Sequence, residues 1–409
     1  MARGFRFFLY SQHLAGIGHF VRTSEIAKSL ARRHEVYLVD GGRPVPHEIT
    51  SAKVTVLSLP RICRGERGIA AFDSDVSVPV VMEKRLQILK AAIELFRPHV
   101  ITIEHFPFRR WELFSEIVPL IVHARIIDKR VKIVGSFRDI PGSSRFDPET
   151  KQHESEVLQV LDEYFDKLLV HSDPRVMRLE EQIAVAGKFN IPLEYTGYVS
   201  QRGDAQQRNR NKRRVDQRRG TVIVSAGGTG NMALLNCAID CWKLLVSRKA
   251  VGDRMLQVFL PLSSHAQDVA ALQRRVADNT SIRLLPYSSD FLNCMRTADL
   301  SISHAGYNTC TNVLETRCRS ILVPNLQMSD QGQRARRFAK RGLATTIDPA
   351  DLTAERLATT VVEQLQKPTL QHDINLDGAR ITSDILEQIC AEEPAAAQHL
   401  EGAQAIQAA

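Results

Sequence analysis

Short apolar runs alternate with longer segments of helical character along most of the chain. The run at residues 5–11 is almost continuously apolar, which is the pattern of a strand buried on both faces of a sheet. Further strands of the first half are predicted at 35–40, 54–57, 100–103, 131–135 and 167–171. Helices are predicted from the turn at 15–19 to about residue 33 and at 80–96, 109–125 and 151–165.

The same alternation restarts at residue 221. Strands are predicted at 221–225, 255–260, 282–285, 299–303 and 320–323. Helices are predicted at 231–246, 266–277, 290–297, 307–316 and 331–340. Strands that alternate with helices indicate parallel sheets. We therefore predict an α/β fold of two doubly wound, Rossmann-like parallel-sheet domains that face a cleft, with ligands beyond the carboxyl ends of the strands.

The charge distribution marks the predicted domain boundaries. Residues 200–220 hold eight Lys or Arg against two Asp, so this segment carries +6 of the net charge of +8. The predicted organisation is an N-terminal domain at 1–199, a basic linker at 200–220, a C-terminal domain at 221–375, a helix at 376–392 that packs back on the N-terminal domain, and a disordered tail at 393–409. The linker lacks the aromatic residues on which bases stack, so a solvated linker is favoured over contact with an anionic membrane, and nucleic acid is not expected.

Composition indicates a cytoplasmic globular protein. Hydrophobic residues make up 44% of the chain without an apolar run of 18 residues, so no transmembrane helix is expected. The seven cysteines form no CxxC motif, which favours free thiols over a disulfide framework or a metal site.

Three loops carry candidate chemistry. The strand at 299–303 runs directly into a helix that begins near Gly306, and the free N–H groups of such a helix start bind anions. Gly227 and Gly228 follow another strand, where glycine allows the backbone to approach a phosphate, although a merely tight turn is the alternative. Gly16 and Gly18 precede His19, whose imidazole would face the cleft as a base or cap the helix.

The order of these motifs is more specific than any one of them. Gly227-Gly228-Thr229, Pro286-Tyr287-Ser288, the run from Ser303 to Thr309, and Ser329-Asp330-Gln331 together resemble the C-terminal domain of GT-B glycosyltransferases of family 28, which includes the peptidoglycan N-acetylglucosaminyltransferases. Motifs of the first half, such as Phe137-Arg138-Asp139, are similar to a bacterial branch of predicted glycosyltransferases.

The resemblance implies roles for individual residues. Contacts to the donor would come from Gly227, Gly228, Thr229, Tyr287, His304, Ala305, Gly306, Asn308, Thr309, Asp330 and Gln331. His19 matches the candidate base of the N-terminal loop, and Gly16 and Gly18 match its acceptor side. The family's ribose-binding Glu corresponds to Asn312, so Glu315, one helical turn later, is the candidate substitute.

The predicted reaction is an inverting, metal-independent glycosyl transfer from a nucleotide sugar, with a UDP-sugar favoured and no cofactor. His19 would remove the proton of the acceptor hydroxyl, with Asp139, Glu104 and His105 as alternative bases. The sequence Asp73-Ser74-Asp75 imitates a metal-binding DxD motif, but it lies in a predicted loop. The rival functions are a sugar-nucleotide 2-epimerase and a non-catalytic sugar-nucleotide-binding subunit.

The acceptor is the least visible partner, and either a small molecule or a lipid-linked acceptor is compatible with the sequence. Residues 106–111 combine aromatic and basic side chains (Phe-Pro-Phe-Arg-Arg-Trp). They would face a membrane or form a packed junction between a strand and a helix, and the packed junction is favoured. Peripheral contact with the inner face of the membrane is the corresponding option for localisation.

Overall fold

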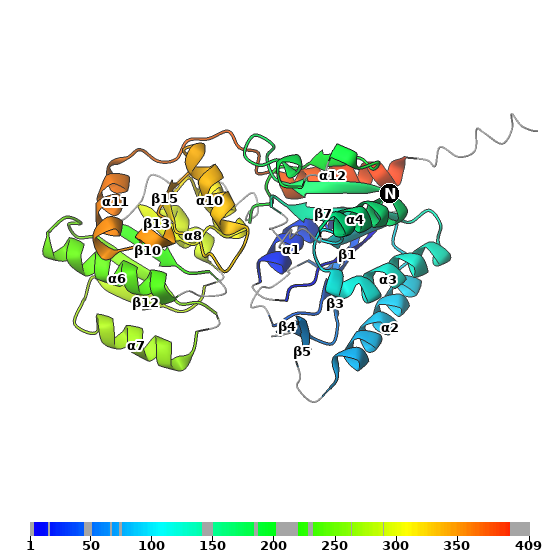
Figure 1. Cartoon of the computed structure of the whole chain (residues 1–409), viewed down its shortest axis with the longest axis horizontal. Coiled ribbons are helices and arrows are strands. Elements are labelled where there is room, and N and C mark those ends of the chain that lie inside the picture. Colours follow the sequence, from blue (N-terminus) through cyan, green and yellow to red (C-terminus); the bar gives the residue numbers. More distant parts are fainter. Residues whose placement is uncertain are drawn as a thin grey trace, which may run out of the picture.

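The computed structural model of the 409-residue chain describes residues 4–14, 17–44, 51–65, 68–72, 76–140, 150–183, 187–201, 220–227, 232–262, 264–288 and 290–392 (Figure 1). Residues 202–219 of the predicted linker and the predicted tail at 393–409 lie outside the described residues. Gly16, Gly228 and Thr229 of the predicted site and Asp73-Ser74-Asp75 lie outside them as well.

The N-terminal lobe is built on a parallel sheet of seven strands. Their order is β3 (Val54–Ser58), β2 (Glu35–Asp40), β1 (Arg6–Tyr10), β6 (Val100–Glu104), β7 (Lys132–Arg138), β8 (Lys167–His171) and β9 (Leu193–Tyr195). The helices of this lobe are α1 (Gly18–Leu30), α2 (Val78–Phe96), α3 (Phe114–Ile127) and α4 (Thr150–Tyr164), with the 3₁₀ turns η1 (Trp111–Leu113) and η2 (Leu179–Glu181). A small antiparallel hairpin, β4 (Ile62–Gly65) with β5 (Gly68–Ala71), lies apart from the main sheet.

The apolar character of β1 follows from layers on both faces of the sheet. Phe7 and Leu9 point into the core formed with α1, whereas Phe8 and Tyr10 point into the core formed with α2 and α3. All four side chains are at most 1% exposed. Successive strand residues face opposite sides, so only a strand covered on both sides requires an unbroken apolar run.

The C-terminal lobe repeats this construction with six parallel strands. Their order is β12 (Ile282–Leu285), β11 (Met255–Phe259), β10 (Thr221–Ser225), β13 (Leu300–Ser303), β14 (Arg319–Leu322) and β15 (Thr345–Thr346). The helices are α6 (Met232–Ser247), α7 (Ala266–Val276), α8 (Phe291–Thr297), α9 (Tyr307–Thr316), α10 (Gln331–Lys340) and α11 (Ala354–Gln366), with the 3₁₀ turn η5 (Pro349–Asp351). None of the described helices of either lobe combines the length and apolar character needed to span a bilayer.

The last helix, α12 (Gly378–Ala391), returns to the N-terminal lobe. The chain crosses from the lobe at the left of Figure 1 to the lobe at the right, where α12 packs beside α1. Leu386 and Ile389 of α12 share a core with Leu9 and Ile26 of the N-terminal lobe. Val199, at the exit of the first lobe, forms a β-bridge with Asp377. The two lobes are therefore connected twice by the chain.

The predicted fold class is confirmed, and the differences are local. The hairpin β4–β5, the edge strands β9 and β15, and α11 were not predicted, because short or partly polar segments give weak periodic signals. Of the two interpretations of residues 106–111, the packed junction agrees with the structure: Phe106 and Phe108 are 0% and 5% exposed. Trp111 stacks on Phe114 with ring centres 5.5 Å apart.

Buried polar contacts join the lobes. Arg334 of α10 forms two hydrogen bonds with Asp139 of the N-terminal lobe, 2.6 and 2.7 Å long, and both side chains are completely buried. The hydroxyl group of Tyr307 donates to the carbonyl oxygen of His171 and accepts from the amide of Val199. These contacts bring the carboxyl ends of the two sheets toward one another.

Candidate active site between the lobes

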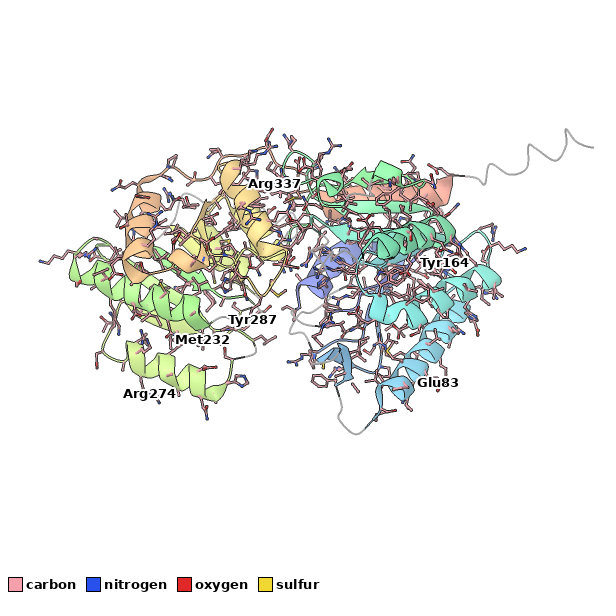
Figure 2. The ribbon with its side chains drawn as sticks, in the orientation of Figure 1. Glu83, Tyr164, Met232, Arg274, Tyr287 and Arg337 are labelled. Carbon is pink, nitrogen blue, oxygen red and sulfur yellow. The ribbon has the colours of Figure 1, made fainter. Side chains whose placement is uncertain are left out.

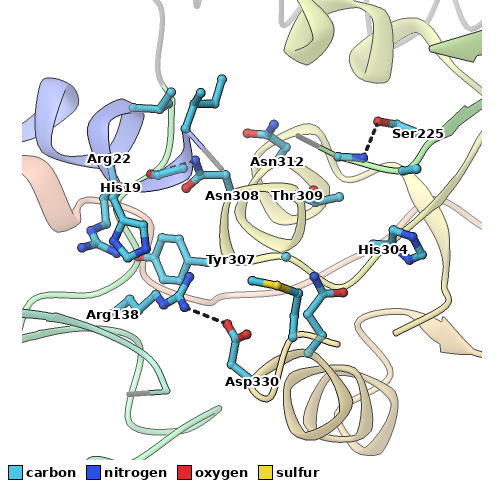
Figure 3. Close-up of a pocket in the computed structure, with 18 of the residues that line it drawn as sticks. His19, Arg22, Arg138, Ser225, His304, Tyr307, Asn308, Thr309, Asn312 and Asp330 are labelled. Atoms are coloured by element: carbon cyan, nitrogen blue, oxygen red, sulfur yellow. Dashed lines mark hydrogen bonds and ion pairs between the residues drawn. The ribbon is translucent and has the colours of Figure 1, made fainter. Parts of the chain in front are cut away.

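A cavity of about 530 Å³ opens between the lobes, beyond the carboxyl ends of the strands (Figure 3). The N-terminal wall comes from the segments after β1 and β6, from the start of α1, from Arg64 of β4 and from Arg138 at the end of β7. The C-terminal wall comes from the segments after β10, β11, β12, β13 and β14. Predicted site residues that line the cavity are Gly18, His19, Gly227, Tyr287, His304, Gly306, Asn308, Thr309, Asp330 and Gln331.

The N-terminus of α9 forms the centre of the C-terminal wall. Gly306 is the N-cap and has no side chain to satisfy the first N–H groups of the helix. Asn308 and Thr309 of the first turn line the cavity, while Ala305 is buried behind them and accepts a hydrogen bond from Arg334. Open N–H groups and the positive end of the helix dipole favour an anion at this place.

His304 lies on the same wall, and its hydrogen bond determines its tautomer. Nδ1 is 2.6 Å from the carbonyl oxygen of Val323. A carbonyl oxygen only accepts, so Nδ1 carries the hydrogen. Nε2 is buried without a partner among the described residues. Burial lowers the pKa of His304, against the opposing effect of Val323, and the neutral ring therefore presents a lone pair at Nε2.

A histidine–glutamate pair forms the centre of the N-terminal wall. His19 Nδ1 lies 3.0 Å from Glu104 Oε1, and Ser11 donates to the other carboxylate oxygen over 2.7 Å. The guanidinium group of Arg22 also bonds Glu104. Because the carboxylate accepts from Nδ1–H, the lone pair of the neutral His19 ring is at Nε2, which is the arrangement of a general base held by an acidic partner.

The pKa values of this pair are consistent with a neutral base and an ionised partner. Burial lowers the pKa of His19 to about 4, although Glu104 acts in the opposite direction. Burial alone would raise the pKa of Glu104, but His19, which is protonated at the low pH where Glu104 titrates, and Arg22 outweigh it and hold the pKa below its ordinary value. At neutral pH the ring of His19 is able to accept a proton.

The other two predicted bases lie behind the cavity wall. His105 is 1% exposed, packs edge-on against His19 with ring centres 4.9 Å apart, and has both ring nitrogens unpaired among the described residues. Asp139 is completely buried, and its carboxylate is bound by Arg334 and by the amide of Ile140. Asp139 therefore joins the lobes, and the structure offers it no access to an acceptor hydroxyl.

The same cluster has the donor set of a metal site. His19, Glu104 and His105 can each offer a ligand atom, and these atoms lie within 4.8 Å of one another. However, Arg22 already bonds the Glu104 oxygen that faces His19. A cation would have to compete with this guanidinium group at short range, so the donor set fits a base and its acidic partner better than a metal ion.

Asp330 and Gln331 lie where α10 begins, close to the N-terminal lobe. Asp330 accepts from Arg334 over 2.7 Å and forms an ion pair with Arg138 at 3.2 Å, and Figure 3 shows the pair of Arg138 and Asp330 across the cavity. Burial acts to raise the pKa of Asp330, but the two guanidinium groups hold it below its ordinary value. Gln331 accepts from the amide of Asn325, which fixes its side chain.

The remaining C-terminal wall combines a glycine turn with an aromatic pocket. Gly227 has φ +70°, a conformation that disfavours other residues, and its amide donates to Ser225. Tyr287 lies with Phe259 and Phe291 along the cavity, and Figure 2 shows Tyr287 on the side of its lobe that faces the other lobe. This group provides the flat apolar surface that a nucleobase needs.

Glu315 was the expected ligand contact of α9, but Asn312 is the residue that lines the cavity. The carboxylate of Glu315 accepts from Ser200 over 3.0 Å and lies 3.7 Å from Arg296, so it is engaged away from the cavity. Asn312 lines the cavity, is 5% exposed, and has its Oδ1 unpaired among the described residues. The open acceptor atom therefore belongs to Asn312.

The arginines of the N-terminal wall were not among the site residues predicted from the sequence. The cavity is lined by Arg22, Arg64, Arg109, Arg110 and Arg138. Arg109 and Arg110 were visible within residues 106–111, and Arg138 lies beside Asp139, at the carboxyl ends of predicted strands. That position was the available signal, because ligands in such sheets bind at the strand ends.

Residues 221–388 match the glycosyltransferase family 28 C-terminal domain. One relative is a UDP-N-acetylglucosamine–N-acetylmuramyl-(pentapeptide) pyrophosphoryl-undecaprenol N-acetylglucosamine transferase from Caldanaerobacter subterraneus, 25% identical over 158 residues, which are 37% of this chain and 42% of that enzyme. The corresponding transferase from Salinibacter ruber is 28% identical over 148 residues, 36% of this chain and 38% of that enzyme. The chain thus matches less than half of the length of these curated relatives.

Solved structures agree with the fold over almost the whole chain. MurG from Acinetobacter baumannii superimposes with a TM-score of 0.55 at 17% identity, covering 94% of this chain and 99% of that one. The glycotransferase of kitacinnamycin gives a TM-score of 0.61 at 15% identity, covering 95% and 100%. At these identities the likeness concerns the fold.

The two parallel-sheet lobes and the cavity between them have the GT-B fold of these solved structures. Within this fold, the C-terminal lobe is similar to the C-terminal domain of glycosyltransferase family 28.

Proposed function

We propose that this protein transfers a glycosyl group from a nucleoside diphosphate sugar to an acceptor hydroxyl. The observation that carries the proposal is the position of two groups in one cavity: the pair of His19 and Glu104 on one wall and the open N-terminus of α9 on the other (Figure 3). One wall supplies a base and the opposite wall supplies a place for a diphosphate. A UDP-sugar is the favoured donor.

The N-terminal wall would activate the acceptor. His19 Nε2 would take the proton of the acceptor hydroxyl as its oxygen attacks the anomeric carbon of the donor sugar. Glu104 would keep Nδ1 protonated and would stabilise the imidazolium that forms, as an acidic partner does in other histidine-dependent sites. A single displacement of this kind inverts the configuration of the anomeric carbon.

The C-terminal wall would stabilise the leaving diphosphate. Negative charge grows on the diphosphate as the glycosidic bond breaks, and the N–H groups of the first turn of α9 are already oriented toward it. Gly227 would allow close approach of the backbone to a phosphate, Tyr287 would contact the nucleobase, and Asp330 and Gln331 would contact the hydroxyl groups of the donor sugar. These steps need no metal ion.

The names of the relatives suggest the acceptor class. The relatives from Caldanaerobacter and Salinibacter act on a pyrophosphoryl-undecaprenol, a lipid-linked substrate. We infer a lipid-linked or small-molecule acceptor for this protein, and a lipid-linked acceptor would bring the N-terminal lobe to the cytoplasmic face of a membrane.

The cavity favours a transferase over a sugar-nucleotide 2-epimerase. Among the described residues that line it, Asp330 is the sole carboxylate, and two guanidinium groups bind it. An epimerase that removes a proton from the sugar ring needs further groups near the sugar that exchange protons. The histidines of the described lining are His19 and His304, and the proposal places His304 at the diphosphate rather than at the sugar ring.

The test is a screen of UDP-, dTDP- and GDP-sugars with the purified full chain, read by mass spectrometry for hydrolysis, transfer and epimerisation. The variant His19→Ala should lower turnover by roughly 10²–10⁴-fold while nucleotide binding stays intact. His123→Ala is the matched control, because His123 also pairs with a glutamate, Glu94, over 2.9 Å but lies outside the cavity. Wild-type turnover in His19→Ala would refute the base, and an epimer formed without acceptor would refute the transferase.

A further inference from the structure

Four arginines of the N-terminal lobe form one side of the cavity, and we call them the arginine wall: Arg64, Arg109, Arg110 and Arg138. They come from separate parts of the chain. Arg64 lies in β4, Arg109 and Arg110 follow β6, and Arg138 is the last residue of β7. Because β6 and β7 are neighbouring parallel strands, their carboxyl ends place three of these residues together. The tertiary fold therefore concentrates four positive charges at one place.

Among the described residues, the acidic partners of the arginine wall are too few to neutralise it. Arg64 lies 3.0 Å from Glu112, and Arg110 lies 3.9 Å from the same carboxylate. Arg138 shares Asp330 with Arg334, which lies closer to that carboxylate. Among the described residues, Glu112 thus serves Arg64 and Arg110, and Asp330 serves Arg138 together with Arg334, which also binds Asp139. Asp330 is in addition the predicted ligand of the donor sugar.

Arg109 has a neutral partner, and two guanidinium donors have none. Arg109 donates to the hydroxyl group of Ser329 over 2.9 Å, across the boundary between the lobes. The Nε atoms of Arg109 and Arg138 are buried without a hydrogen-bond acceptor in the described part of the chain. Buried donors of charged groups are normally satisfied, so these two leave the positive charge of the arginine wall incompletely compensated.

The crowding of the arginine wall also affects its protonation. Burial lowers the pKa of Arg109 to about 10, and the nearby charge of Arg138 adds to the effect. The pKa values of Arg110 and Arg138 are lowered as well, again first by burial. Positive groups that disfavour one another in a partly buried place gain most from an anion that binds between them.

The diphosphate of the donor does not account for these charges. Its proposed place is the start of α9, on the opposite wall, where Figure 3 shows Thr309 and His304 away from Arg138. We propose that the arginine wall binds a second anionic group, a carboxylate or a phosphoryl group, carried by the acceptor or by the donor sugar. Guanidinium groups bind both oxyanions through paired N–H donors. This inference rests on the proposed function, because it assigns the diphosphate to the other wall.

The experiment measures a second anion beside a bound nucleotide. The full chain is saturated with UDP and then titrated with inorganic diphosphate in a calorimeter. The test variant is Arg64→Gln with Arg110→Gln, because both residues pair with Glu112 and neither contacts the C-terminal lobe in the described structure. The control is Arg125→Gln with Arg130→Gln, which removes the same charge outside the cavity. We expect diphosphate to bind at least about tenfold more weakly to the test variant only, with UDP affinity unchanged.

A second titration distinguishes the two sources of the anion. If the donor sugar carries it, UDP-glucuronate will bind more tightly than UDP-glucose, and the test variant will lose the difference. If the acceptor carries it, the two sugar nucleotides will bind alike while inorganic diphosphate still binds beside UDP. Either result supports the arginine wall as an anion site.

The results distinguish a failure of the second anion site from a failure of the proposed function. If UDP binds but diphosphate does not bind beside it, and the two sugar nucleotides bind alike, the second anion site is refuted and the glycosyltransferase proposal stands. If no nucleotide binds, the proposed function fails, and inorganic diphosphate titrated alone decides the arginine wall. Binding that the test variant loses then supports the site, and binding that it retains refutes it.

Discussion

The two walls of the cavity are built by different means. The C-terminal wall offers backbone N–H groups, a glycine turn, hydroxyl and amide groups and an aromatic pocket, and Asp330 is the one charged residue among its described lining residues. The N-terminal wall offers five guanidinium groups and the pair of His19 and Glu104. We expect the C-terminal wall to bind the constant part of the ligand, the nucleoside diphosphate. We expect the N-terminal wall to select and activate the acceptor.

This difference explains why the walls differ in how visible they are in the sequence. The N–H groups at the start of a helix favour a diphosphate. A few neighbouring residues, here Gly306, Asn308 and Thr309, determine where such a helix begins, so the site is visible in the sequence. The charged wall is assembled from the ends of separate strands and a hairpin. The charged residues of this wall share no sequence motif, so the wall can be recognised only in the folded structure.

The largest effect is expected when the ion pairs between the two lobes are removed. The variant Arg334→Met would leave the carboxylate of Asp139 buried without a guanidinium partner and would leave Asp330 with Arg138 alone. We expect the free energy of unfolding to fall by about 3–5 kcal/mol. Urea unfolding measures this change, with Arg336→Met on the exposed face of α10 as control. A change below 1 kcal/mol in Arg334→Met would show that these pairs do not hold the lobes together.

The N-terminal wall can be tested by changing Glu104, the acidic partner of the proposed base His19. Glu104→Gln should lower kcat by about 10²-fold, because the amide no longer stabilises the imidazolium of His19. In Ser11→Ala the carboxylate keeps His19 and Arg22, so kcat should stay near the wild-type value. Equal losses in the two variants would contradict the role of the carboxylate charge.

The pH profile tests the same pair without a mutation. The base must be unprotonated, and its pKa of about 4 lies below the ordinary value for histidine. The kcat/KM of the wild-type protein should therefore be constant from about pH 7 down to pH 5 and should fall as the pH decreases through about 4. An acidic limb centred between pH 6 and 7 would show that His19 is not the group that limits the reaction.

For His304 of the C-terminal wall we expect the opposite pH dependence, because here the protonated ring favours binding. His304 donates from Nδ1 to Val323, so its Nε2 can donate to a phosphate only after the ring gains a proton. UDP binding should take up as much as one proton, and affinity should weaken by at most about tenfold per pH unit as the pH rises. Calorimetry in two buffers of different ionisation enthalpy measures the uptake. His304→Gln should abolish it, and His372→Gln, a histidine bonded to the Leu314 carbonyl outside the cavity, should not. Binding without proton uptake would mean that Nε2 accepts from a hydroxyl group instead.

The smallest expected effect concerns Asn312. Its Oδ1 is an open acceptor in the cavity wall, and we expect it to accept from a hydroxyl group of the nucleotide's ribose. Asn312→Leu should weaken UDP binding by about 1 kcal/mol, a factor of about five. A nucleotide without the contacted hydroxyl should bind the wild-type protein and the variant equally, so UDP and 2′-deoxy-UDP are compared in both. An unchanged ratio of the two affinities would remove Asn312 from the ribose contact.

Much of the fold could be predicted because its signals are local. The strand β1 is apolar on both faces, and it is buried on both faces in the structure. Elements such as β15, with two residues, and the hairpin β4–β5 are too short for a periodic pattern and exist because neighbouring elements support them. Most of the predicted donor residues line the cavity, whereas Ala305 and Glu315 are turned to structural partners.

By itself, the sequence determined the class of fold, the two sheets and the helix start at Gly306, because hydrophobic periodicity and helix capping act over a few residues. The tertiary structure alone decided which charged groups meet. It placed Asp139 against Arg334 and away from the cavity, paired His19 with Glu104, and gathered the arginine wall from the ends of separate strands. The physical reason is that an ion pair or a hydrogen bond depends on distance and burial, and residues far apart in the chain acquire both only when the sheets are assembled.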